Sequence, residues 1–234
     1  MRLAIMQPYI LPYIGYFQLI NAVDKFVIYD NIQFTKKGWI NRNRILVNGH
    51  DEYITLPLKK DSDYLNVNER VLADIFPETK IKLLRKLTDA YKKAPQFEVL
   101  FPLLLKIINS EEINLFKYIY SALKVVCNYL EINTEIIISS TIPINHQLKS
   151  HEKVIAICKE LEATNYVNPI GGMELYSFEI FKKNGIDLKF IKTNLIEYKQ
   201  FNYDFTPWLS IIDVLMFNSK ENVQNQIISG YTII

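Results

Sequence analysis

The first thirty residues carry the pattern that most restricts the fold: a strand, a turn, a helix and a second strand in succession. Residues 2–6 form a short apolar run, as expected of a buried strand, and two prolines then turn the chain. Residues 13–22 carry apolar side chains at helical spacing, and residues 25–29 form the next strand, which ends at Asp30. Two strands joined through one helix form a βαβ unit, so the sequence predicts a parallel sheet.

Strands and helices continue to alternate in the second half of the chain. This pattern predicts an α/β fold with a parallel sheet and flanking helices. A helix-rich segment at about residues 70–132 is expected to form either an inserted subdomain or a cover. No linker or repeat divides the chain, so we expect a single domain over residues 1–234. The other expected elements are a hairpin turning at Asn48-Gly49, helices at 77–92, 97–130, 150–161 and 210–217, a helix ending before Asn184-Gly185, and strands at 136–139, 166–168 and 188–191.

Composition and charge describe a folded protein without a strong electrostatic bias. Hydrophobic residues make up 49% and the formal net charge is +2, which excludes global disorder and offers no basic excess for binding nucleic acid. Glutamine and proline interrupt the uncharged run at residues 3–23, so we expect no membrane insertion. Two isolated cysteines fit a reducing compartment, and we expect a cytoplasmic protein. Attachment to the inner membrane through a partner and formation of a homodimer are left open.

Several well-known chemical motifs are missing from the sequence. The seven glycines have no spacing that matches the dinucleotide-binding fingerprint or the P-loop, and neither HExxH nor GxSxG occurs. The three histidines are not joined by a cluster of cysteine or aspartate, so we predict no metal site.

Three segments follow predicted strands and carry candidate binding residues, because ligands of α/β sheets bind at the carboxyl ends of the strands. The tyrosine corner (residues 7–16) follows the first strand, and its alternative interpretation is a packing corner. The basic loop (residues 30–44) follows the second strand and suits a phosphate or pyrophosphate with a stacked ring, the alternative being a solvated loop. The candidates are Gln7, Tyr9, Tyr13 and Tyr16 in the corner, and Gln33, Lys37, Trp39, Arg42, Asn43 and Arg44 in the loop.

The glycine bend (residues 166–176) is the third segment. Its paired glycines, Gly171 and Gly172, expose backbone N–H groups that suit an anion or an oxyanion, although a tight strand-to-helix turn explains them as well. Asn168 and Tyr176 are further candidates in this bend. Elsewhere, Asp213 stands in an apolar helix and needs a partner if buried, for which we expect an arginine.

Three stretches of sequence resemble the WbqC-like protein family. They are MQPYILPYIGYFQLINAVDKFVIYDNIQFTKKGWINRNRI at 6–45, YVNPIGGMELY at 166–176 and PWLSIIDVLMFN at 207–218, and the likeness extends in order over essentially the whole chain. Members of this family are found with bacterial surface-polysaccharide genes, especially O-antigen loci of lipopolysaccharide biosynthesis. The resemblance implies a transferase that attaches an aminoacyl or acyl group, glycine being one candidate, to the amine of a nucleotide-linked amino sugar.

A division of roles follows from this activity. We expect Lys37, Arg42 and Arg44 to hold the pyrophosphate of the nucleotide sugar, and Trp39 or a tyrosine to stack on its base. The acyl donor is a thioester, an acyl or aminoacyl carrier, or an acyl-adenylate made with ATP.

Direct attack by the amine is expected, since no nucleophile motif is present. His146, or else Asp30, is the candidate base that takes the proton from the amine. The amides of the paired glycines or the side chain of Asn168 would hold the tetrahedral oxyanion.

A second likeness leads to two alternatives. The opening of the chain is similar to that of nucleotidylyltransferases and pantothenate synthetase, which carry His-x-Gly-His where this chain has Tyr13-Ile14-Gly15-Tyr16. The likeness implies the fold and a nucleotide pocket, while the histidines that stabilise a triphosphate are missing. The alternatives are therefore a nucleotidyl- or adenylyl-transferase with tyrosines in place of histidines, and a non-catalytic scaffold of a polysaccharide-assembly complex.

Overall fold

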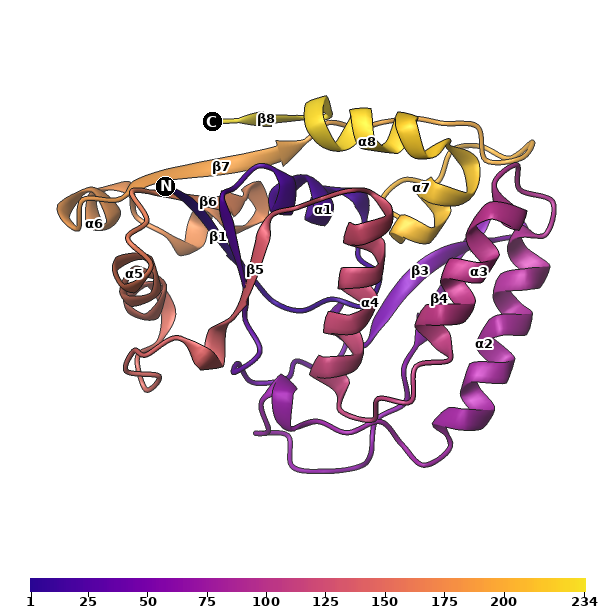
Figure 1. The fold of residues 1–234 in the computed structure, drawn as a ribbon, viewed down its shortest axis with the longest axis horizontal. Helices are drawn as coiled ribbons and strands as arrows, with labels where there is room; N and C mark the ends of the chain where they lie inside the picture. Colours follow the sequence, from indigo (N-terminus) through magenta and orange to yellow (C-terminus); the bar gives the residue numbers. More distant parts are fainter.

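A six-stranded sheet forms the centre of the computed structural model, which describes all residues from 1 to 234 (Figure 1). Its strand order is β5-β2-β1-β6-β7-β8, and all neighbours are parallel except the last pair. The predicted α/β class with a mostly parallel sheet is thereby confirmed. The strands are β1 (Arg2–Met6), β2 (Lys25–Ile28), β5 (Glu135–Ile138), β6 (Asn165–Pro169), β7 (Asp187–Thr193) and β8 (Tyr231–Ile233).

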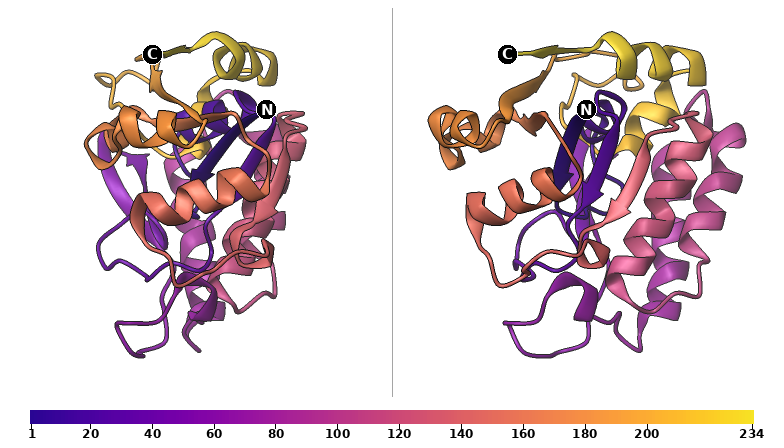
Figure 2. Two further views of the ribbon diagram at one scale, coloured as in Figure 1. Left: turned by 90° about the vertical axis from the view of Figure 1, so that its left-hand side faces the viewer. Right: turned by 60° about the vertical axis from the view of Figure 1, so that its left-hand side comes forward.

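The two faces of the sheet are buried in separate hydrophobic clusters. Successive residues of β1 alternate between them: Ala4 lies in the larger cluster, whereas Leu3 and Ile5 lie in the smaller. This alternation follows from the two-residue period of a strand. Figure 2 shows helices on both sides of the sheet. The larger cluster takes side chains from α1 (Ile14–Asn21), α2 (Phe76–Tyr91), α3 (Phe97–Ile108), α4 (Leu115–Tyr129), α7 (Ile211–Phe217) and α8 (Lys220–Ser229), and the smaller from α5 (Ser150–Glu160) and α6 (Phe178–Lys183).

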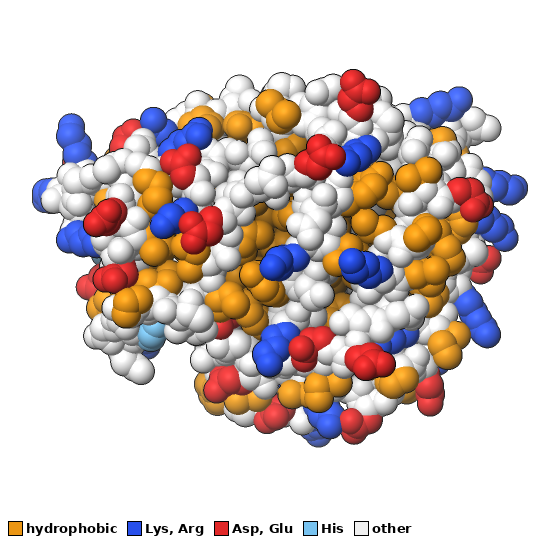
Figure 3. All heavy atoms as spheres, viewed as in Figure 1, with side chains coloured by type: hydrophobic (Ala, Val, Ile, Leu, Met, Phe, Trp, Pro, Cys, Tyr) orange, Lys and Arg blue, Asp and Glu red, His pale blue; other side chains and the backbone are white.

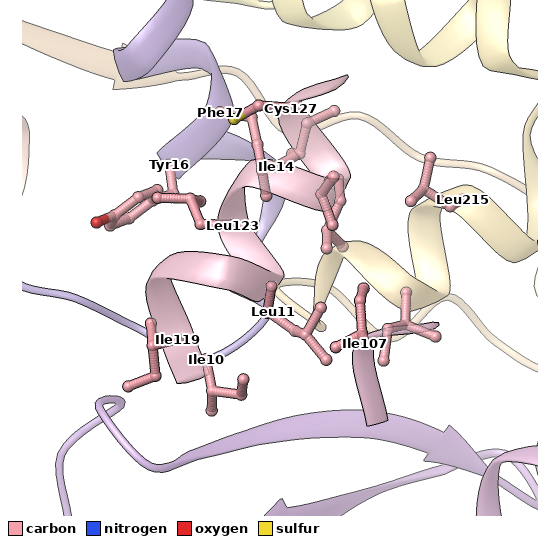
Figure 4. Packing of buried hydrophobic residues seen from close by; sticks show 14 of the residues in the cluster. Ile10, Leu11, Ile14, Tyr16, Phe17, Ile107, Ile119, Leu123, Cys127 and Leu215 are labelled. Carbon is pink, nitrogen blue, oxygen red and sulfur yellow. The ribbon is translucent and has the colours of Figure 1, made fainter. Parts of the chain in front are cut away.

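The helix-rich middle packs on the same core as the sheet. Figure 4 shows Ile107 of α3 and Leu123 of α4 facing Ile14 of α1 and Leu11 of the preceding turn. The single helix predicted at 97–130 is wrong, because the chain breaks between α3 and α4. Asn114 caps the second helix by accepting a hydrogen bond from the Lys117 backbone amide.

The hairpin forms as predicted, with β3 (Arg42–Val47) paired to β4 (His50–Thr55). Its turn residues Asn48 and Gly49 have φ of 50° and 83°, the left-handed values that this dipeptide favours. Short 3-10 turns, η1 (Val67–Glu69), η2 (Ser139–Thr141) and η3 (Ile170–Leu175), complete the connections. Neither α8 nor β8 is predicted from the sequence pattern, because their side chains are largely polar or exposed.

Charges of both signs are mixed on the visible surface. On the face in Figure 3, lysine and arginine side chains are interspersed with aspartate and glutamate. None of the helices has the length and apolar character needed to cross a membrane. No three side chains of histidine, cysteine, aspartate or glutamate gather in a way that could hold a metal ion.

Asp213 is fully buried in α7, and the prediction that an arginine pairs with it is wrong. Its carboxylate accepts hydrogen bonds from the hydroxyls of Tyr91 and Tyr198, at 2.8 and 2.7 Å, and from the Gln200 amide at 2.6 Å. Burial raises the pKa of Asp213, and the three donors oppose that rise. The Tyr91 hydroxyl also accepts from the backbone amide of Leu46, so this network joins α7 and α2 to β3.

Replacing Tyr91 with phenylalanine should lower the free energy of unfolding by about 1–3 kcal/mol, because Asp213 and the Leu46 amide each lose a buried partner. Urea denaturation of the variant measures this loss. Tyr64→Phe is the matched control, since Tyr64 is 84% exposed, and we expect a change within about 0.5 kcal/mol. Equal stability of the two variants would contradict the role given to the network.

Candidate functional site

The carboxyl-end pocket, a cavity of about 560 Å³, opens where the strand order reverses between β1 and β6. At such a point the connections after two neighbouring strands run in opposite directions and leave a crevice, which is where α/β proteins bind ligands. Gln7 and Tyr9 contribute from the end of β1, Gln33 from the loop after β2, and Asn168 from the end of β6. None of the sixteen lining residues is charged; those predicted from the sequence are Gln7, Tyr9, Gln33, Asn168, Gly171, Gly172 and Tyr176.

The two glycines of the glycine bend face different surroundings. Gly172 packs against the Asn168 side chain so closely that a methyl group there would overlap the amide nitrogen. Gly171 has nothing within 4 Å of where its Cβ would lie. Because η3 spans only six residues, its amides do not amount to a helix N-terminal anion site. The side chain of Asn168 is therefore the better oxyanion candidate of the bend.

Asn168 is held with one amide hydrogen available. Its Oδ1 accepts from the buried Tyr166 hydroxyl at 3.1 Å, and its Nδ2 donates to the Pro169 carbonyl at 3.2 Å. An amide nitrogen has two hydrogens, so the second can serve a ligand in the pocket.

Tyrosine hydroxyls supply most of the other polar groups of this pocket. Burial raises the pKa of Tyr29 to about 12, with a contribution from Tyr176, and also raises the pKa of Tyr9 and Tyr176. These phenols therefore stay protonated and uncharged at neutral pH.

A second cavity, the aromatic pocket, has a volume of about 280 Å³ and shares Tyr9 with the first. The tyrosine corner thus touches both pockets, whereas the basic loop and the glycine bend contribute mainly to different ones. Arg44 is the sole charged residue among those lining either pocket. The lining consists of Tyr9, Pro12, Tyr13, Trp39, Asn43, Arg44 and Trp208.

Hydrogen bonds between backbone and side chains fasten three distant segments around the aromatic pocket. Asn43 is buried, and its Nδ2 donates to the carbonyls of Ile10 and Leu11 at 3.0 and 2.8 Å. Ser210 donates its hydroxyl to the Leu11 carbonyl at 2.7 Å and its amide to the Arg44 carbonyl at 2.9 Å. Asn43 therefore acts as a brace, with its amide nitrogen occupied, although it was predicted to bind substrate.

The predicted cations of the basic loop separate in the structure. Arg42 donates Nε to the Gly38 carbonyl at 3.0 Å and Nη2 to the Lys37 carbonyl, and its guanidinium lies over the Tyr53 ring. It closes its own loop and lines neither pocket, and Lys37 is exposed outside both. Of the three cations expected at the pyrophosphate, only Arg44 faces a pocket.

Tyr16 lies in the core, outside both pockets. Its hydroxyl donates to the Gln7 carbonyl at 2.8 Å, and its ring packs edge-on against Phe26. Gly15 beside it leaves room for the Tyr13 ring and Thr193, both of which a methyl group would overlap. Tyr16 thus positions the pocket residue Gln7 and does not face a ligand.

Both candidate bases are occupied by neighbouring groups. The buried carboxylate of Asp30 accepts from the amide and hydroxyl of Ser140, at 2.8 and 2.6 Å, and from Asn68 at 2.8 Å. The Nε2 of His146 lies 3.0 Å from the Ile142 carbonyl and its Nδ1 lies 2.9 Å from the Asn31 amide nitrogen. Neither residue lines the pockets, so their geometry supports holding the ends of β2 and β5 and not proton transfer.

Comparison with known proteins fits this arrangement. Residues 7–225 match the WbqC-like protein family over nearly the whole chain, including all three pocket-forming segments. The chain belongs to the WbqC-like protein family. It is 30% identical over 221 residues to "Uncharacterized protein Rv1507c" of Mycobacterium tuberculosis (strain ATCC 25618 / H37Rv). The aligned region covers 93% of each protein. No solved structure matches the chain.

One residue that lines a pocket and one that lies beside a pocket residue were missed in the sequence. Trp208 lines the aromatic pocket, and the buried Lys153 of α5 lies with its Nζ 4.8 Å from the Tyr29 ring centroid and 3.4 Å from Asn31 Oδ1. Burial lowers the pKa of Lys153, against an opposing effect of Asp30. Nothing in the local sequence relates Trp208 to the pocket, and a lysine in a helix gives no signal for Lys153.

Gly172→Ala should displace the Asn168 amide and reduce stability, because the added methyl overlaps that side chain. Gly171→Ala is the matched control, and it should fold with unchanged stability since its methyl points into open space. Thermal unfolding and a crystal structure of each variant measure the difference. Two equally stable variants with unmoved Asn168 would contradict the packing described for the bend.

Proposed function

We propose that this WbqC-like protein is a transferase of bacterial surface-polysaccharide biosynthesis that acylates the amine of a nucleotide-linked amino sugar. The observation that carries the proposal is the pair of adjoining pockets with different chemistry, joined at Tyr9. One is aromatic with a single cation, and the other is larger and lined wholly by neutral side chains. A nucleotide sugar has the same two parts, a base with phosphates and a neutral ring.

The distribution of charge supports a different end of the proposed substrate in each pocket. Phosphates gain from a guanidinium, so the nucleotide belongs in the aromatic pocket with Arg44. The sugar and the acyl group belong in the carboxyl-end pocket, where amides and protonated tyrosines offer hydrogen bonds without charge.

The neutral lining also bears on how the amine becomes a nucleophile. An ammonium loses its hydration in such a pocket and finds no carboxylate there, so its pKa falls and the free amine is favoured. His146 and Asp30 are then not needed as bases. The amine nitrogen attacks the acyl carbon, the N–C bond forms, the bond from that carbon to its leaving group breaks, and the proton of the amine goes to the leaving group.

Asn168 is the residue proposed to stabilise the tetrahedral oxyanion, through its second amide hydrogen. The donor is a thioester, on a small molecule or on an acyl or aminoacyl carrier, or an acyl-adenylate formed with ATP. The alternative of nucleotidyl transfer is less well supported, because the Tyr16 hydroxyl is bonded to the main chain in the core and lines neither pocket.

The test is incubation of the protein with nucleotide-diphospho amino sugars and candidate donors, followed by mass spectrometry. We expect the mass of the sugar to increase by one acyl or aminoacyl group with loss of the free amine. Pyrophosphate release without acylation would favour nucleotidyl transfer, and no binding of any nucleotide sugar would favour the scaffold.

Asn168→Asp should lower kcat about 10²–10³-fold with little change in KM, because a donor aimed at the oxyanion is replaced by an acceptor of the same shape. The Tyr166 hydroxyl keeps its acceptor in this variant, whereas the bond from Nδ2 to the Pro169 carbonyl is lost, so thermal unfolding of the variant accompanies the kinetics as a control for the fold. Steady-state kinetics measures the effect. Unchanged kcat would remove Asn168 from the mechanism.

A further inference from the structure

Both tryptophans of the chain line the aromatic pocket, although 169 positions separate them in the sequence. Trp39 is 39% exposed and Trp208 is 48% exposed, so two large apolar rings are left partly uncovered at one cavity. Exposed aromatic surface that gathers at a pocket indicates a binding site.

Each indole is held in place by neighbours of its own. Trp39 stacks on Tyr53 with ring centroids 6.2 Å apart, and the guanidinium of Arg44 lies 5.5 Å from the Trp39 ring centroid. Trp208 meets the edge of Tyr13 at 5.9 Å. The same Arg44 donates Nη2 to the Trp208 carbonyl at 3.4 Å, so one side chain connects both walls of the pocket.

The backbone at Trp208 is strained. Its φ is 60°, in the left-handed region that bulky residues seldom adopt and that costs of order 1–3 kcal/mol. Bonds from Ser210 to Leu11 and Arg44 hold the next turn of chain against the pocket and keep this conformation in place. Leu11 and Phe201 also have positive φ away from the pocket, so the strain at Trp208 supports a role in binding only together with the exposure of its ring at the cavity.

We propose that Trp39 and Trp208 form a clamp for the planar base of a nucleoside diphosphate, with its phosphates beside Arg44. The inference rests on the proposed function, and it adds Trp208 as the residue that determines selectivity for a base. Stacking on indole favours a flat π-system. The lining contains indole N–H, phenol and guanidinium donors, which suit the acceptor atoms of a base, and Asp51, outside the lining, pairs with Arg44 Nη1 at 3.1 Å and leaves Nη2 on the side of Trp208.

The tryptophans themselves report on the clamp, because the chain has no others. We expect a nucleoside diphosphate to quench the intrinsic tryptophan fluorescence in a saturable way. One purine and one pyrimidine nucleoside diphosphate are titrated. Inorganic pyrophosphate and an amino sugar 1-phosphate are the arms that lack a base, and they should bind at least tenfold more weakly. Binding of either as tightly as the nucleotide would overturn the clamp.

Trp208→Gly removes the indole and relieves the left-handed strain, since glycine adopts this φ freely. By calorimetry we expect its affinity for the nucleoside diphosphate to fall roughly 5- to 150-fold, as the loss of one stacking contact implies. Trp208→Phe should lose less, and Tyr64→Ala, at an exposed ring outside both pockets, should lose nothing. Equal affinity of wild-type protein and both Trp208 variants would overturn the proposal.

The outcomes also separate the clamp from the transferase. Nucleotide binding that depends on Trp208, without acyl transfer to any sugar, would leave the clamp standing and remove the proposed function. Acyl transfer by Trp208→Gly with an unchanged KM for the nucleotide sugar would leave the proposed function standing and remove the clamp.

Discussion

The candidate site depends on the hydrogen bonds that fasten residues 208–211 to two other parts of the chain. Ser210 bonds to the carbonyls of Leu11 and Arg44, and the Ile211 amide donates to the Pro12 carbonyl at 2.9 Å. Asn43 closes the same arrangement from the hairpin by donating to Ile10 and Leu11. Leu11, Asn43, Ser210 and Ile211 are buried, so a bond lost among them leaves an unsatisfied donor or acceptor. The turn at residues 8–12, β3 and residues 208–210 before α7 are thereby held together as one wall of the candidate site.

The sheet and this wall together produce two pockets with different electrostatics. The order reversal between β1 and β6 opens the neutral pocket, and the wall carries the aromatic one with Arg44. Tyr9 belongs to both because it lies in the turn that follows β1. A ligand with a charged, planar end and a neutral end is the class that this geometry supports.

The parts of this arrangement that depend on local pattern were predictable from the sequence. Short apolar runs and proline or glycine signals located β1, α1, β2 and the hairpin within a few residues, and the polar residues after β1 and β6 line the expected end of the sheet. The break at residues 109–114 was missed because α3 and α4 are both apolar with no proline or glycine between them.

The remaining errors concern which partner a polar side chain finds, which only the tertiary fold decides. Arg42 curls back onto the carbonyls of its own loop, and Asp213 is satisfied by two tyrosines and a glutamine and not by an arginine. Trp208 was not expected at the site because nothing local relates it to Trp39. Its position follows from the bonds of Ser210, which join residues more than 160 positions apart.

The most direct test of the account is a crystal structure of the protein with a nucleotide-linked amino sugar. The account predicts the base between Trp39 and Trp208, the phosphates at Arg44, and the sugar amine beyond Tyr9 within reach of Asn168. A ligand bound in the opposite direction, or outside both pockets, would contradict it.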